Sequence, residues 1–281
     1  MTEPADLSAP IGVFDSGVGG LSVLRAIRAE LPGVRSVYVA DQAHVPYGPR
    51  PLAEVRAFAE AIARYLIGRG ARVIVVACNA ASAGALLRLR EAFPTIPFVG
   101  MEPAVKPAAE TTRTGKVGVL ATPATFQGEL FASVVERFAN GVELLNHTCP
   151  GLVARIEAGD LAGPETRAIL EGALRPMLER GIDTVVLGCT HYPFVIPLIE
   201  RIAGPGVRVI DPAPAVARQA ARVLAQAAPG VAASWGRAPV LPVTSGDPGR
   251  MTELLPRMLG ERWPVGRVIW TADGRLEDVS G

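Results

Sequence analysis

The sequence predicts an α/β fold made of two related units, each built on a parallel sheet. Two observations support this prediction. Short runs rich in β-branched residues alternate with longer segments of helical period, and three motifs of the first half recur in the same order in the second half. Such alternation is typical of parallel sheets that helices cover on both faces.

The predicted strands are continuous apolar runs. A strand whose residues are apolar throughout, without alternation, is buried on both faces of its sheet. Between two of these runs, residues 52–68 (LAEVRAFAEAIARYLIG) have the amphipathic spacing of a surface helix. The predicted strands are residues 11–14, 36–40, 72–77, 116–120, 183–188, 207–210 and 267–271.

The internal repeat gives the domain organisation. Its three pairs are IGVFDS (11–16) with VGVLAT (117–122), VIVVACNA (73–80) with TVVLGCTH (184–191), and FVGMEPAV (98–105) with RVIDPAPAV (208–216). The spacings agree, since 63 residues separate Asp15 from Cys78 and 68 separate Ala121 from Cys189. We therefore expect one discontinuous domain of residues 1–102 plus 211–281 and a second domain of residues 103–210.

The composition narrows the class of protein. The 281 residues are 49% hydrophobic and 20% charged, which is typical of a packed globule, and the net charge of +1 gives no reason to expect nucleic acid or membrane as a partner. No apolar run approaches the roughly 20 residues of a membrane span. The start, MTEPADLSAP, is too polar and acidic for a signal peptide, and three cysteines do not make a disulfide framework. We expect a cytoplasmic protein with free thiols.

Two cysteines are candidates for chemistry. Cys78 and Cys189 each follow a predicted strand and precede a small polar residue, Asn79 or Thr190. Ligands of parallel sheets bind beyond the carboxyl ends of the strands, where helix N-termini offer free N–H groups and favour a thiolate. Two facing units would place both thiols on opposite walls of one cleft. His191 could share a proton with Cys189, or it could be an ordinary histidine at a helix start.

Several other kinds of site fit less well. Cys149 is best interpreted as an ordinary buried cysteine. The sequence contains no paired C-x-x-C or H-x-x-x-H motif that would indicate a zinc site. In DSGVGG (15–20), the glycine pattern of a nucleotide loop fails because Ser22 stands at its third position. Pyridoxal chemistry needs a lysine, and Lys106 and Lys116 lie in no recognisable cofactor setting. We therefore expect neither a metal nor a cofactor.

Together, five motifs make the sequence resemble the cofactor-independent aspartate/glutamate racemases. GCTHYP and the DSG-type opening favour the glutamate branch of that family. The resemblance implies two pseudo-symmetric, flavodoxin-like domains with the active site in the cleft between them. It also implies glutamate as substrate, a homodimer, and supply of D-glutamate for peptidoglycan. The motifs are FDSGVGGLSV (14–23), PYG (46–48), ACNAAS (77–82), CPGLV (149–153) and LGCTHYP (187–193).

The resemblance also implies residue roles. Cys78 and Cys189 would be acid and base on opposite faces of the substrate α-carbon, with Cys78 attacking D-glutamate and Cys189 L-glutamate. An ordinary thiol is only about a tenth ionised at pH 7.5, so we expect Asp15 to assist Cys78 and His191 to assist Cys189. Asp41 and Glu157 also align with ionisable groups thought to assist the thiols, although Glu157 could equally be an exposed helix carboxylate. The substrate-binding residues implied are Asp15, Ser16, Tyr47, Gly48, Asn79, Ala80, Thr190 and His191.

The sequence departs from the family pattern at four places. Ala80 stands where the family has Thr, Gly128 and Phe131 stand where Ser and Tyr are expected, and Pro212 replaces the Ser of a DSA motif. We expect these departures to affect substrate affinity more than reaction type. Two alternatives stay open: a racemase for aspartate or another amino acid, and a non-catalytic glutamate-binding protein, for which Ala80 is the one hint.

Overall fold

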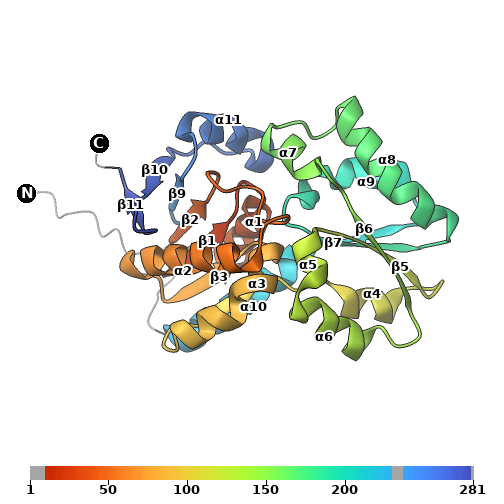
Figure 1. Ribbon diagram of the computed structural model, residues 1–281, viewed down its shortest axis with the longest axis horizontal. Helices are drawn as coiled ribbons and strands as arrows, with labels where there is room; N and C mark the ends of the chain where they lie inside the picture. The colour runs from red at the N-terminus through yellow and green to blue at the C-terminus, as the bar shows by residue number, and fades with distance from the viewer. Residues whose placement is uncertain (1–9, 230–236, 280–281) are drawn as a thin grey trace, which may run out of the picture.

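The protein contains two sheets, which the computed structural model describes for residues 10–229 and 237–279 (Figure 1). The first sheet has the order β11-β10-β9-β2-β1-β3-β4 and the second has the order β6-β5-β7-β8. The first comprises β1 (Ile11–Asp15), β2 (Ser36–Ala40), β3 (Val73–Val76), β4 (Phe98–Gly100), β9 (Val240–Thr244), β10 (Gly266–Trp270) and β11 (Leu276–Asp278). The second comprises β5 (Lys116–Ala121), β6 (Glu143–Thr148), β7 (Thr184–Gly188) and β8 (Arg208–Ile210).

Helices connect the strands and cover the sheets. They are α1 (Leu21–Glu30), α2 (Leu52–Gly68), α3 (Asn79–Ala92), α4 (Val105–Thr111), α5 (Pro123–Gln127), α6 (Glu129–Phe138), α7 (Leu152–Glu157), α8 (Pro164–Glu179), α9 (Ile196–Ala203), α10 (Ala213–Ala227) and α11 (Pro248–Leu259), with a 3₁₀ turn, η1 (Tyr192–Val195). None of these helices is long and apolar enough to cross a membrane.

The inner strands of each sheet are buried on both faces, as the apolar runs predict. Phe14 of β1 packs in a cluster with residues of α2 and α3, whereas its neighbour Val13 packs with α1, α10 and α11. In the second sheet, Val119 packs with α4 and α6, and Leu120 packs with α8 and α9. Successive side chains of a strand point to opposite faces, so a strand covered on both sides has to be apolar throughout.

The internal repeat is confirmed by the topology. The order β2-β1-β3-β4 recurs in the second sheet as β6-β5-β7-β8. The register recurs as well: Ile11 of β1 pairs with Val73 of β3, and Val117 of β5 pairs with Thr184 of β7. The predicted α/β class, with two related parallel sheets, is therefore correct. We propose domain boundaries near residues 102 and 211, where the chain passes from one sheet to the other.

The predicted strands match the observed ones to within one residue at each end, and the predicted helix 52–68 coincides with α2. Four strands were not predicted. β4 has only three residues. β6 is a half-exposed edge strand with polar residues, β9 contains Pro242, and β11 has only three residues. β11 also pairs antiparallel with β10, so the first sheet is not parallel throughout.

Candidate functional site

Both candidate thiols face one small cavity at the carboxyl ends of the strands. Cys78 follows β3 and Cys189 follows β7, at equivalent positions of the two sheets. The cavity has a volume of about 20 Å³, roughly the room that one water molecule needs. An amino acid can enter only if the walls part. The lining residues are Ser16, Pro46, Tyr47, Gly48, Cys78, Asn79, Ala80, Thr122, Val153, Cys189, Thr190 and His191.

A larger and more open hollow lies elsewhere. Its volume is about 1010 Å³, and its lining includes Thr184 and Arg208, which begin β7 and β8. It therefore lies at the amino ends of these strands, the edge opposite the thiols. In parallel sheets, chemistry is found at the carboxyl edge, so the small cavity is the candidate active site.

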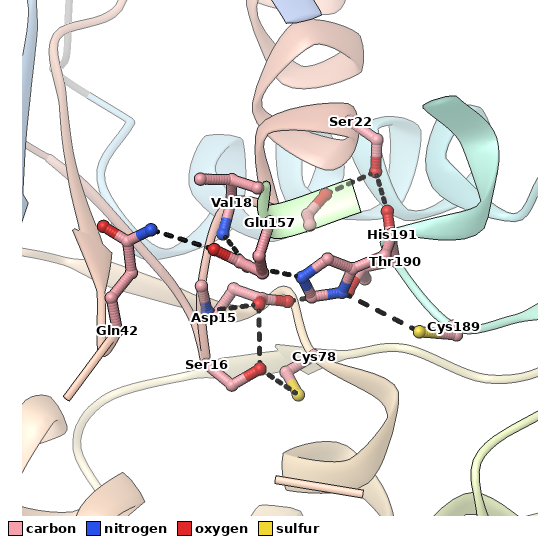
Figure 2. Close-up of polar contacts among 12 residues, drawn as sticks. Asp15, Ser16, Val18, Ser22, Gln42, Cys78, Glu157, Cys189, Thr190 and His191 are labelled. Atoms are coloured by element: carbon pink, nitrogen blue, oxygen red, sulfur yellow. Dashed lines mark hydrogen bonds and ion pairs between the residues drawn. The ribbon is translucent and has the colours of Figure 1, made fainter. Parts of the chain in front are cut away.

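On one wall, Cys78 is linked to Asp15 through Ser16. The Cys78 thiol lies 4.0 Å from the Ser16 hydroxyl, which donates to Asp15 Oδ1 at 3.2 Å (Figure 2). The other carboxylate oxygen accepts from the Thr190 hydroxyl at 2.7 Å. Burial raises the pKa of Asp15 to about 6, and burial together with the Asp15 charge raises the pKa of Cys78. Cys78 therefore rests as a thiol beside a carboxyl group whose pKa is well above that of an ordinary aspartate.

On the other wall, Cys189 is linked to Glu157 through His191. The Cys189 sulfur lies 3.8 Å from His191 Nδ1, and Nε2 lies 2.7 Å from Glu157 Oε1 (Figure 2). Burial alone would lower the pKa of His191, but contact with Cys189 and Glu157 outweighs it and raises that pKa well above its usual value. Burial would likewise raise the pKa of Glu157, and contact with His191 lowers it instead. An imidazolium beside the sulfur stabilises a thiolate.

One interpretation of the sequence made Glu157 an exposed helix carboxylate, and this interpretation is wrong. Glu157 ends α7 with 7% of its surface exposed, and it accepts from the backbone N–H of Val18 at 2.8 Å and from Gln42 Nε2 at 2.9 Å, besides His191. Val18 and Gln42 belong to the part of the chain that carries the first sheet. The carboxylate therefore joins the two units at the site.

Asp41 contacts neither thiol. Its carboxylate is fully buried and accepts from the Tyr47 hydroxyl at 2.6 Å. It also contacts Ser245 at 2.6 Å, Trp270 at 2.7 Å and His44 at 2.9 Å. Asp41 thus fixes Tyr47, which lines the cavity.

Asn79 offers an unused amide to the cavity. Its side chain is 3% exposed, and neither its nitrogen nor its oxygen has a hydrogen-bond partner. Buried polar atoms are rarely left unpaired in proteins. Asn79 is the first residue of α3, whose free N–H groups also face the carboxyl edge of the sheet. The arrangement suits an anionic ligand with hydrogen-bond donors.

Of the four departures from the family pattern, only Ala80 lines the cavity. A Cβ at Gly128 would lie 2.5 Å from that of Ala83 in α3, so glycine permits this close packing. Phe131 is buried in the second sheet's core, edge-on to Phe126 at 5.2 Å. Pro212 precedes α10 as its N-cap. The expected effect on affinity therefore has a structural basis only at Ala80.

The cavity also contains residues that were not predicted: Pro46, Thr122 and Val153. For Thr122 the signal existed, because the repeat pairs VGVLAT with IGVFDS and so aligns Thr122 with Ser16. Within residues 10–229 and 237–279, no group of three or more His, Cys, Asp or Glu side chains is arranged to hold a metal ion.

The comparisons with known proteins agree with this geometry. The family model of the Asp/Glu/hydantoin racemases matches residues 11–220. The chain belongs to the Asp/Glu/hydantoin racemase family. It is 52% identical to the glutamate racemase of Pseudomonas paraeruginosa over 261 residues, which cover 93% of this chain and 98% of that protein. The resemblance inferred from the motifs is therefore confirmed, and this racemase-family chain is an enzyme of the isomerase class.

Solved structures of glutamate racemases share the two-domain fold. The Escherichia coli enzyme, in complex with L-glutamate and the activator UDP-MurNAc-Ala, matches with a TM-score of 0.81 at 32% identity, covering 97% of this chain and 100% of that one. The Francisella tularensis enzyme, in complex with D-glutamate, matches with a TM-score of 0.80 at 27% identity, covering 95% and 99%.

Proposed function

We propose that this racemase interconverts L- and D-glutamate with Cys78 and Cys189 as the two acid/base groups. One observation carries the proposal. The thiols face a single cavity from equivalent strand ends of two sheets, and each has its own ionisable partners. Inversion at a carbon needs a base on one face and an acid on the other. Two thiols on opposite walls meet that need without a cofactor.

The proposed step conserves charge. With L-glutamate bound, the Cys189 thiolate takes the α-proton while the Cys78 thiol gives its proton to the opposite face of the α-carbon. Cys189 becomes a thiol, Cys78 becomes a thiolate and D-glutamate forms. The reverse reaction restores the first state. His191 supports the thiolate at Cys189. In the enzyme form that takes D-glutamate, Asp15 can accept the Cys78 proton through Ser16 and so leave Cys78 as the thiolate base.

Glutamate is the proposed substrate because relatives of high identity are named glutamate racemases and two similar structures hold its enantiomers. We propose that the substrate α-carboxylate lies against the backbone N–H groups of residues 79–80 and 190–191, with Asn79 donating its amide. From the same resemblance, we propose that the enzyme works in the cytoplasm as a homodimer and supplies D-glutamate for peptidoglycan.

A circular-dichroism assay tests the proposal. Pure L-glutamate should lose its signal as the racemic mixture forms. In deuterated water, the α-hydrogen of glutamate should be replaced by deuterium much faster than the α-hydrogen of aspartate. Exchange with aspartate alone would favour the aspartate branch. Binding of glutamate without exchange would favour a non-catalytic protein, and either outcome rejects the proposal.

We expect kcat/KM to follow a bell-shaped curve with pH. Below the raised pKa of Asp15, about 6, this carboxyl is protonated and can no longer accept a proton from the Cys78 side. At alkaline pH, His191 loses the charge that supports a Cys189 thiolate. Because these groups interact, each limb belongs to the coupled set rather than to one residue. The range from about pH 5 to 10 extends to both sides of the pKa of an ordinary thiol. A flat profile of kcat/KM over this range would count against the mechanism.

Ala80→Thr should change KM rather than kcat. A hydroxyl at this position of the cavity wall can add one hydrogen bond to the substrate, worth about 0.5–1.5 kcal/mol, which would lower KM roughly two- to tenfold. A bond equal in ground and transition states leaves kcat unchanged. Titration with glutamate checks this expectation. A raised KM would mean that the wall is packed too tightly around alanine to accept a larger side chain.

A further inference from the structure

Gln42 links the core of the first sheet to the Cys189 wall of the site. It follows Asp41 just beyond the end of β2, and its Nε2 donates to Glu157 Oε2 at 2.9 Å (Figure 2). Its Oε1 accepts from the hydroxyl of Thr244 at 2.8 Å. Thr244 is the last residue of β9 and is fully buried. Both ends of the amide are therefore fixed, and its orientation follows from its partners.

The contacts form one chain from β9 to a thiol. They run from Thr244 to Gln42, from Gln42 to Glu157, from Glu157 to His191 and from His191 to Cys189. Within the described residues, the Glu157 carboxylate receives three donors: His191, the backbone of Val18, and Gln42. Gln42 is the one side chain among them that comes from the first unit. Cys78 is linked differently: it contacts Ser16, which donates to Asp15, and Asp15 accepts from the Thr190 hydroxyl of the second unit.

We propose that Gln42 is a positioning residue that holds the Glu157 carboxylate against His191, and thereby controls how strongly this imidazole supports Cys189. The proposal rests on the proposed racemase function and deepens it. Gln42 and Glu157 lie on opposite units, so an opening of the cavity that separates the units would break their contact. Full support of Cys189 is then available only when the cavity is closed around the substrate.

The charged surroundings of His191 determine what the loss of Gln42 should do. His191 is in contact with Glu157 and Cys189, and it also faces the charge of Asp15. Glu157 faces the Tyr38 hydroxyl, which donates to the Gly17 carbonyl. Glu157 stays ionised where His191 titrates, but without the Gln42 donor its carboxylate is no longer held against the imidazole, and the contact between them loosens. The pKa of His191 should then fall, because part of what raises it comes from Glu157.

The test replaces Gln42 by methionine, which keeps the length and volume of the side chain but lacks the amide. Gln42 is partly exposed, so the variant should fold. The chain has three histidines, which makes the His191 ring signal assignable by NMR. We expect Gln42→Met to lower the pKa of His191, to move the alkaline limb of kcat/KM to lower pH, and to reduce kcat/KM roughly three- to tenfold. The same change at exposed Gln226 on α10 is the control and should alter none of these.

A double-mutant cycle separates positioning from a general loss of packing. Thr244→Val removes the hydroxyl that fixes the amide, so it should shift the pKa of His191 in the same direction, by less. If Thr244 acts through Gln42, adding Thr244→Val to Gln42→Met should cause no further shift. An unchanged pKa of His191 in Gln42→Met, or additive shifts in the double variant, would overturn the proposal. The titration of His191 needs no turnover, so a wild-type protein that fails to racemise glutamate would reject the proposed function but leave this test readable.

Discussion

Cys78→Ser and Cys189→Ser should each lower kcat/KM for glutamate by about 10²- to 10⁴-fold, the usual contribution of a positioned acid or base. A serine hydroxyl is far harder to ionise than a thiol, so it can neither take the α-proton nor return it at a useful rate. Each cysteine is buried, at 5% and 7% exposure, and the substitution removes little volume. Both variants should therefore fold, and circular dichroism with L-glutamate measures the loss.

Exchange in deuterated water gives the thiol prediction a second readout. The two enantiomers of glutamate have equal free energy, so kcat/KM is the same in both directions and cannot show which thiol failed. Cys78→Ser retains the thiol proposed to face L-glutamate, and should exchange the α-proton of that enantiomer only. Cys189→Ser should exchange D-glutamate only. The third cysteine, Cys149, is buried outside the cavity lining, so Cys149→Ser is the control that should keep most activity. Near-normal turnover in either cavity variant would reject the two-base mechanism.

Much of the fold was predictable because burial on both faces leaves a local signal. Strands β1, β3, β5 and β7 are apolar apart from Asp15, Lys116 and Thr184 at their ends, and they were located to within one residue. The signal is weak where few residues are buried, and it was also missed in interior strand β9, which contains Pro242. Edge strand β6 has no fully buried residue, and β11 has one, so neither differs in composition from a loop.

The sequence predicted which residues would meet at the site better than how they would be joined. The repeat placed Cys78 and Cys189 at equivalent strand ends, and parallel sheets bring such ends to one edge. The contacts between the units depend instead on how two separately folded sheets face each other. Glu157 contacts Gln42 across 115 residues, and Ser22 contacts the Thr190 carbonyl across 168. No local pattern predicts such pairs, which is why Gln42 was missed and Glu157 had two readings.

Glu157→Gln should cost both stability and activity, because the carboxylate is the buried partner of a charged imidazole. Gln keeps the shape of the side chain but loses the charge. Hydrogen bonds to charged groups are worth about 1.5–3 kcal/mol, so the free energy of unfolding should fall by about that amount. Activity should fall about 10- to 100-fold, as for carboxylates that orient metal-binding histidines.

The loss of stability should depend on pH in a defined way. The pKa of Glu157 is lowered in the folded state, so its contribution is present above its unfolded value of 4.5 and is lost as the pH falls through the folded pKa. The pKa of His191 is raised, so its contribution is full below 6.5 and is lost as the pH rises through the folded pKa. The difference between wild type and Glu157→Gln should therefore be largest between pH 4.5 and 6.5.

Chemical denaturation at several pH values measures this difference. The control is Glu54→Gln, which removes an exposed ion pair with Arg50 and should change the free energy of unfolding by at most about 0.5 kcal/mol at any pH. A constant difference between wild type and Glu157→Gln from acid to alkaline pH would show that Glu157 serves as packing rather than as a charge. His191 would then lack the anion that keeps it protonated. The free backbone N–H groups beside Cys189 would have to stabilise its thiolate instead.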